Sequence, residues 1–74
     1  MIENEAAAAK VSKSLQDAFE ILGQSMLTVN ECCEKSEAEL YRQKIGDIFY
    51  IIVFGLLEPL YKTHPQLKPS DWKD

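Results

Sequence analysis

Residues 37–61 carry apolar side chains on two separate sides of one predicted helix, and this feature constrains the fold most. The first row, repeating every three or four positions, contains Tyr41, Ile45, Ile48, Phe49, Ile52, Leu56 and Leu60. The second row contains Tyr50, Phe54, Leu57 and Tyr61, and its centre lies about 150° away at 100° per residue. One neighbouring helix covers only one such row. The sequence therefore predicts that the other row meets a second copy or another protein.

The length of the chain favours the same conclusion. At 74 residues the protein has room for one domain, and a chain this short buries only about 60–65% of its unfolded surface. Cys32 and Cys33 are neighbours, so they cannot link distant segments of one chain. A small fold without such staples is usually stabilised by oligomerisation, and we expect a homodimer.

A first helix is predicted from about residue 5 to residue 34. Small or apolar residues recur there at alternating steps of four and three, which is typical of a helix packed along one seam. The seam contains Val11, Leu15, Ala18, Leu22, Ser25, Val29 and Cys32. Polar residues occupy the opposite face, so this helix is amphipathic.

A turn is expected between residues 34 and 36. Ser36 followed by Glu39 fits a capping box, with the serine at the N-cap and the glutamate three positions on. The seam of the first helix does not continue past this point, which favours a hairpin. One long rod stays open as an alternative, because no glycine or proline interrupts the junction.

The second helix is predicted over residues 37–58 or beyond. Pro59 removes a backbone donor and crowds the carbonyl of Gly55, so we expect a kink or a stop near Leu57. Residues 1–62 then form a helical hairpin, and residues 63–74 form an extended, proline-containing tail. Within the tail, Leu67 and Trp72 are predicted to dock near the row of Tyr50, Phe54 and Leu57. A frayed terminus is the alternative.

The predicted fold is all-α: an antiparallel two-helix hairpin that dimerises into a four-helix bundle and carries an extended C-terminal tail. The spacing resembles that of short helical hairpins that dimerise in this way, and such a likeness implies an architecture and no function. The predicted association interface contains Ile48, Tyr50, Ile52, Phe54, Leu57 and Tyr61.

Residues that could carry chemistry are few. Two adjacent cysteines do not make a zinc site, which needs four spaced ligands, so we expect both to pack as small apolar residues. Four glutamates near the turn, at positions 31, 34, 37 and 39, are typical of a solvated helix end. His64 is expected on the surface of the tail, with no nucleophile beside it. The sequence predicts no catalytic, cofactor or metal site.

Charge and hydropathy narrow the classes of partner. The net charge of −4 argues against nucleic-acid binding, which normally requires a basic patch. The apolar run from Ile48 to Leu57 is shorter than the roughly 20 residues that span a bilayer. The acidic start lacks the pattern of a signal peptide, so a cytoplasmic location is expected.

The predicted function is that of a non-enzymatic homodimer acting as a protein-binding or regulatory module. Two alternatives stay open. One is a small subunit of a larger complex, with a different protein covering the second row. The other is an enzyme or ligand binder with a pocket formed across the dimer.

Overall fold

The computed structural model describes residues 1–72, and helices make up 83% of them with no strand in that range. The elements are α1 (Glu5–Cys32), α2 (Lys35–Tyr50), the π-helix η1 (Ile51–Leu57), α3 (Glu58–Thr63) and the short 3₁₀ helix η2 (Pro65–Leu67). The prediction of an all-α chain is confirmed over these residues.

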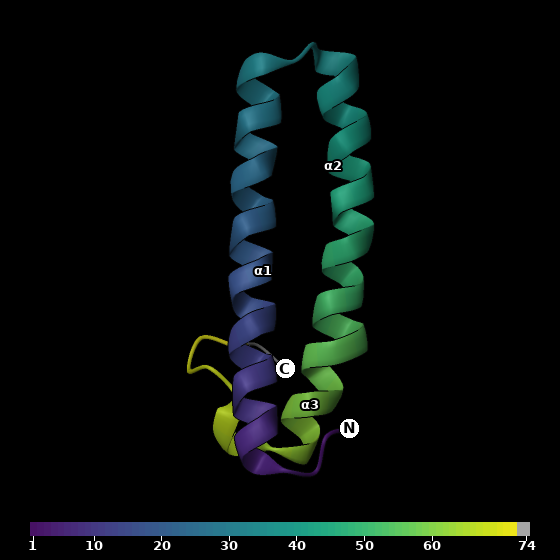
Figure 1. Cartoon of the computed structure of the whole chain (residues 1–74). Coiled ribbons are helices and arrows are strands. Elements are labelled where there is room, and N and C mark those ends of the chain that lie inside the picture. The colour runs from purple at the N-terminus through teal and green to yellow at the C-terminus, as the bar shows by residue number, and fades with distance from the viewer. Residues whose placement is uncertain (73–74) are drawn as a thin grey trace.

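The helices α1 and α2 lie side by side along most of their length, and the chain crosses between them at one end (Figure 1). Near the crossing, the hydroxyls of Ser25 and Tyr41 are 2.7 Å apart. Further along, the rings of Phe19 and Phe49 stack with centroids 4.1 Å apart. The molecule is therefore long and thin, with extents of 44 × 20 × 16 Å.

The connection between the helices differs from the predicted capping box. Cys33 and Glu34 both have extended backbone, and α2 begins directly after them at Lys35. Ser36 lies inside the first turn of α2, so the prediction that it caps the helix is wrong. Glu34 takes the N-cap position without a side-chain cap bond, and its carbonyl accepts from the Ala38 amide at 3.0 Å. The reversal is complete before Ser36 is reached, which leaves that residue no capping role.

The π-helix η1 interrupts the second helical segment and was not predicted from the sequence. Before it, the buried positions follow α-helical spacing, with Ile45 at 4% exposure and Ile52 at 7%. The next buried residue is Leu57, five positions after Ile52, and Leu60 and Tyr61 follow three and four positions later. A regular α-helix would turn by about 500° over five residues, placing Leu57 about 140° from Ile52. Bonds from residue i to i+5 widen the turn and bring both residues to the same side.

This change of phase corrects the prediction that one neighbouring helix covers only one apolar row. Leu57 and Tyr61 come from the second row, yet they pack with Ile52 of the first row in a single cluster. Leu15 and Leu22 of α1 lie against that cluster. The two rows are joined on one face, so α1 covers members of both.

Pro59 gives a local reason for the change. In an α-helix its ring would crowd the carbonyl of Gly55, and it has no N–H to donate. In the structure Pro59 is the second residue of α3, which continues η1 without a break in the helical backbone. The residue before it, Glu58, donates back to the Val53 carbonyl, five positions earlier.

Candidate functional site

The six residues predicted to form an association interface divide into two groups. Ile52, Leu57 and Tyr61 are buried inside the chain, with exposures of 7% or less. The other three, Ile48, Tyr50 and Phe54, remain exposed at 41%, 66% and 52%. The buried three are therefore not free to form an outer contact surface. Ile52 continues the α-helical spacing of Ile45, and the wider turn of η1 brings Leu57 and Tyr61 to the same side, towards α1.

The exposed members belong to a continuous apolar patch on the outside of α2 and η1, which we call the outer patch. It contains Ile48, Tyr50, Ile51 and Phe54. Steps of three residues make Ile51 a neighbour of both Ile48 and Phe54 on the helix surface. The rings of Tyr50 and Phe54 touch at a centroid distance of 4.9 Å. Ile51, which is 58% exposed, was not among the predicted residues. Its position in the sequence, three residues from both Ile48 and Phe54, could have shown that it belongs to the same patch.

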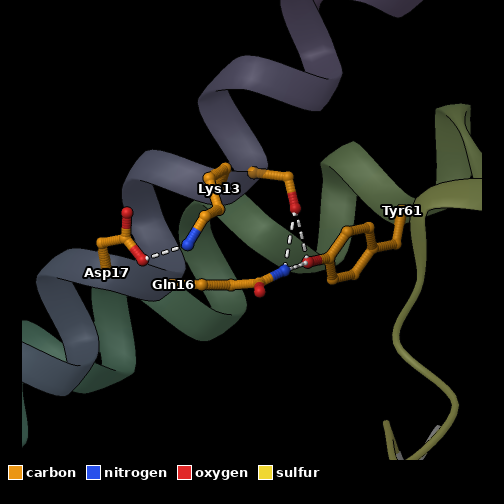
Figure 2. A network of polar contacts seen from close by, with 5 residues as sticks. Lys13, Gln16, Asp17 and Tyr61 are labelled. Atoms are coloured by element: carbon orange, nitrogen blue, oxygen red, sulfur yellow. Dashed lines mark hydrogen bonds and ion pairs between the residues drawn. The ribbon is translucent and has the colours of Figure 1, made fainter.

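A polar network joins α1 to α3 at the far end of the molecule from the chain crossing (Figure 2). The buried hydroxyls of Ser12 and Tyr61 are 2.8 Å apart. The Gln16 amide donates to both of them, at 3.1 Å to Ser12 and 3.0 Å to Tyr61. Each buried hydroxyl is satisfied, so the network fixes the relative position of the two helices. Ser12 was not predicted as a seam residue because its position falls outside the alternating steps of four and three that run through Val11 and Leu15.

Beside this network, on the exposed side of α1, Lys13 donates to Asp17 at 2.7 Å (Figure 2). This hydrogen bond, together with the charge of Asp17, raises the pKa of Lys13 above its ordinary value of 10.5. The pair lies on the solvent side of α1 and does not enter the network of Tyr61.

Residues 64–72 of the C-terminal tail fold back onto the helices, and residues 73 and 74 lie outside the described part of the chain. Leu67 and Trp72 pack against the cluster of Ile52, Leu57 and Tyr61. The Trp72 ring meets Tyr61 edge-on, with centroids 5.0 Å apart. The tail is not simply extended, because η2 and a turn at Ser70 and Asp71 interrupt it.

Two open clefts flank Trp72. One, of about 400 Å³, is lined by Glu58, Tyr61, Lys62, Pro65, Lys68 and Trp72. The other, of about 320 Å³, is lined by Gln16, Phe19, Val53, Leu57, Tyr61, Pro69, Asp71 and Trp72. Their lining mixes apolar rings with polar groups that already have partners, such as the Tyr61 hydroxyl and Gln16.

His64 lies in the interior, which corrects the prediction of a surface histidine. Its exposure is 7%, and its Nε2 lies 2.7 Å from the Ile2 carbonyl oxygen. The ring thereby ties the N-terminal segment to the end of α3. No local sequence pattern indicates this contact, because Ile2 and His64 are 62 positions apart.

Cys32 and Cys33 are both free and exposed at the crossing between α1 and α2. The prediction that they pack as small apolar residues is therefore wrong. The seam between the helices ends before reaching them, since the chain is already reversing at Cys33.

Two further properties concern metals and membranes. Residues 1–72 contain no group of three or more histidine, cysteine, aspartate or glutamate side chains placed to hold a metal ion. None of the helices in this range combines the length and the hydropathy needed to cross a bilayer.

Comparison with known proteins adds no assignment. No family model, curated protein or solved structure matches this chain. The outer patch and the contacts around Tyr61 are therefore the basis for any functional conclusion.

Proposed function

We propose that the protein is a non-enzymatic, self-associating module: an antiparallel helical hairpin whose outer patch packs against α2 of a second copy to complete a four-helix bundle. In this assembly α1 covers the inner face of α2 and η1, and the second copy covers their outer face. The dimer then offers its remaining surface to other proteins as a binding or regulatory unit.

The outer patch is the observation that carries the proposal. Four large apolar side chains lie next to one another on one helix, each between 41% and 66% exposed. Contiguous apolar patches of this kind usually mark an interaction surface. The four side chains come from two helical turns, so a second helix can lie along them.

The size of the exposed surface supports an assembly of two chains. A compact monomer of 8.4 kDa exposes about 4,600 Å², whereas this chain exposes 5486 Å². The excess of about 900 Å² is close to the area of about 800 Å² that each partner contributes to a standard interface. The Cα radius of gyration of 14.6 Å also exceeds the roughly 11 Å of a compact domain of this length.

Sedimentation velocity at micromolar concentration tests the proposal with a matched pair of variants. Phe54→Glu places a charge in the proposed contact and is expected to give a monomer. Because Phe54 is half exposed within one chain, circular dichroism should show that the monomer stays helical. Leu27→Glu makes a similar change at a position on α1 that is 61% exposed and outside the patch, and this variant should stay dimeric. A wild-type protein that is monomeric and stably folded would contradict the proposal.

A second candidate function is that of a small subunit in a larger complex. The observation favouring it is that Ile21 and Leu27 of α1 are also exposed, at 64% and 61%, and lie outside the outer patch. Substituting both by lysine should leave self-association intact. Loss of binding to a co-purifying protein in that variant would support this candidate.

A further inference from the structure

We infer that two copies pair antiparallel through their α2 helices about a two-fold axis, with Lys44 of each copy against Asp47 of the other and Leu40 against Ile51. The inference rests on the proposed self-association and specifies its orientation and register. It adds the charged residues Lys44 and Asp47 to the proposed contact, which the outer patch alone would make apolar.

The four residues form one stripe on α2, which we call the Leu40–Ile51 stripe: Leu40, Lys44, Asp47 and Ile51. Their steps of four, three and four residues keep them on one side of a helix. Leu40 and Ile51 are each 58% exposed, and Lys44 and Asp47 are exposed as well. Neither charge belongs to an ion pair within residues 1–72. The stripe is thus unused by its own chain, with an apolar residue at each end and opposite charges between them.

Two-fold symmetry makes this order self-complementary. In a contact of this type, if residue i meets residue j of the second copy, then j meets i in return. An antiparallel register that sets Leu40 opposite Ile51 also sets Lys44 opposite Asp47. Moving four residues forward along one helix, from Leu40 to Lys44, corresponds to moving four residues back along the other, from Ile51 to Asp47. Each apolar contact and each ion pair then occurs twice. All four stripe residues meet a chemically suitable partner.

The same charges argue against the parallel orientation. Parallel helices in register would place Lys44 against Lys44 and Asp47 against Asp47 of the second copy. Like charges directly opposite each other destabilise a contact and exclude the wrong arrangement.

Charge exchange tests the register. Lys44→Asp and Asp47→Lys, each alone, should weaken the dimer about tenfold at low salt, since two attractive contacts become repulsive. The double variant Lys44→Asp/Asp47→Lys restores opposite charges and should return the dissociation constant to within about twofold of wild type. High salt should shrink the differences, because exposed charges are screened.

The pair Lys13 and Asp17 supplies the matched control. It is also a lysine–aspartate pair on a helix, but it lies on α1. Lys13→Asp and Asp17→Lys create the same like-charge contact within one chain and should leave the dissociation constant unchanged. If the wild type dimerises but the double variant at positions 44 and 47 does not recover, the register is wrong while self-association stands. If the wild type does not dimerise, the proposed function itself fails.

Crosslinking gives a readout that does not depend on charge. Leu40→Cys and Ile51→Cys are made separately in a Cys32→Ser/Cys33→Ser background, mixed, and oxidised with a mild disulfide reagent. The antiparallel register predicts that the mixed crosslink between Cys at 40 and Cys at 51 dominates. Dominant crosslinks between identical positions would overturn the inference in favour of a parallel pairing.

Discussion

Tyr61 shows how a single side chain serves two roles in this molecule. Its ring belongs to the apolar cluster with Ile52 and Leu57, and it lies nearly perpendicular to the Trp72 ring. Its hydroxyl belongs to the polar network with Ser12 and Gln16. A tyrosine is suited to this position because one end of it is apolar and the other needs a hydrogen-bond partner.

Removing the Tyr61 hydroxyl should destabilise the fold. Tyr61→Phe takes a partner from the buried Ser12 hydroxyl, and we expect the free energy of unfolding to fall by about 1–2 kcal/mol. Tyr50→Phe makes the same chemical change at a residue that is 66% exposed, and its effect should stay within about 0.5 kcal/mol. Urea denaturation monitored by circular dichroism measures both. Equal effects would mean that the network contributes nothing specific.

The Lys13–Asp17 pair makes a prediction about pH. The hydrogen bond to Asp17 raises the pKa of Lys13, so the pair stabilises the folded chain fully below the ordinary lysine pKa of 10.5. This contribution is lost as the pH rises through the raised pKa of the folded state. Asp17→Asn should bring the pKa of Lys13 back towards 10.5, as measured by NMR titration of its side-chain resonances. An unchanged titration would show that the contact does not form in solution.

For single residues, the sequence predicted the burial of apolar side chains better than the burial of polar ones. The seam residues Leu15 and Leu22 do lie against the core cluster, because hydrophobic spacing is a direct signal for burial. Ser12 and His64 are buried through hydrogen bonds with residues 49 and 62 positions away. Local spacing contains no information about partners that distant in the chain.

At the scale of elements, the π-helix determines which residues face α1. Ile52 and Leu57 share one face only because η1 accommodates an extra residue between them. A π-helical turn is equivalent to an α-helix with one residue inserted. Reading residues 37–61 at 100° throughout therefore predicts the correct helix but assigns Leu57 and Tyr61 to the wrong side.

Two single-residue deletions test this equivalence. Both are made in a Pro59→Ala background, so that a regular helix is free of the proline clash. Deletion of Gly55, which is exposed within η1, should let residues 51–57 become α-helical while Leu57 keeps its position against α1. We expect the free energy of unfolding to stay within about 1 kcal/mol of the background protein, since the missing residue is the one that the π turn adds.

Deletion of Gly46 is the matched control. This glycine is also exposed, but it lies in the regular helix α2 between Ile45 and Ile52. Its removal turns all later residues by about 100° and should cost at least about 3 kcal/mol through lost core contacts. If the two deletions destabilise the protein equally, the π-helix is not what aligns the core.

At the scale of the whole molecule, the core is small and depends on a tail that covers one end. Leu67 and Trp72 close the cluster around Tyr61, and His64 joins the first residues of the chain to the same end. Terminal segments of proteins are usually ordered only where they contact the rest of the fold. Here the contacts of Leu67 and Trp72 hold the tail in place. Pro65 and Pro69 aid this by restricting the chain between the contacts.

Trp72 allows the tail contact to be measured directly, because it is the single tryptophan of the chain. Its emission should be blue-shifted in the folded protein, partly protected from an aqueous quencher, and red-shifted on unfolding. Trp72→Ala should lower the free energy of unfolding by about 1–2 kcal/mol, less than for a fully buried tryptophan. Ser70→Ala, at an exposed tail position, should have almost no effect. Full quencher access in the native protein would mean that the tail does not dock in solution.

The two exposed thiols at the chain crossing give this protein a built-in distance reporter. Within one copy, a dye attached at Cys33 lies far from Trp72, which is docked near the opposite end of a molecule 44 Å long. In the antiparallel pair that we infer, residue 33 of one copy comes level with residue 58 of the other, close to the Tyr61–Trp72 contact. Energy transfer from Trp72 to the dye would therefore arise between copies rather than within one. Its strength would follow assembly as the protein is diluted, with no change to the chain beyond the label.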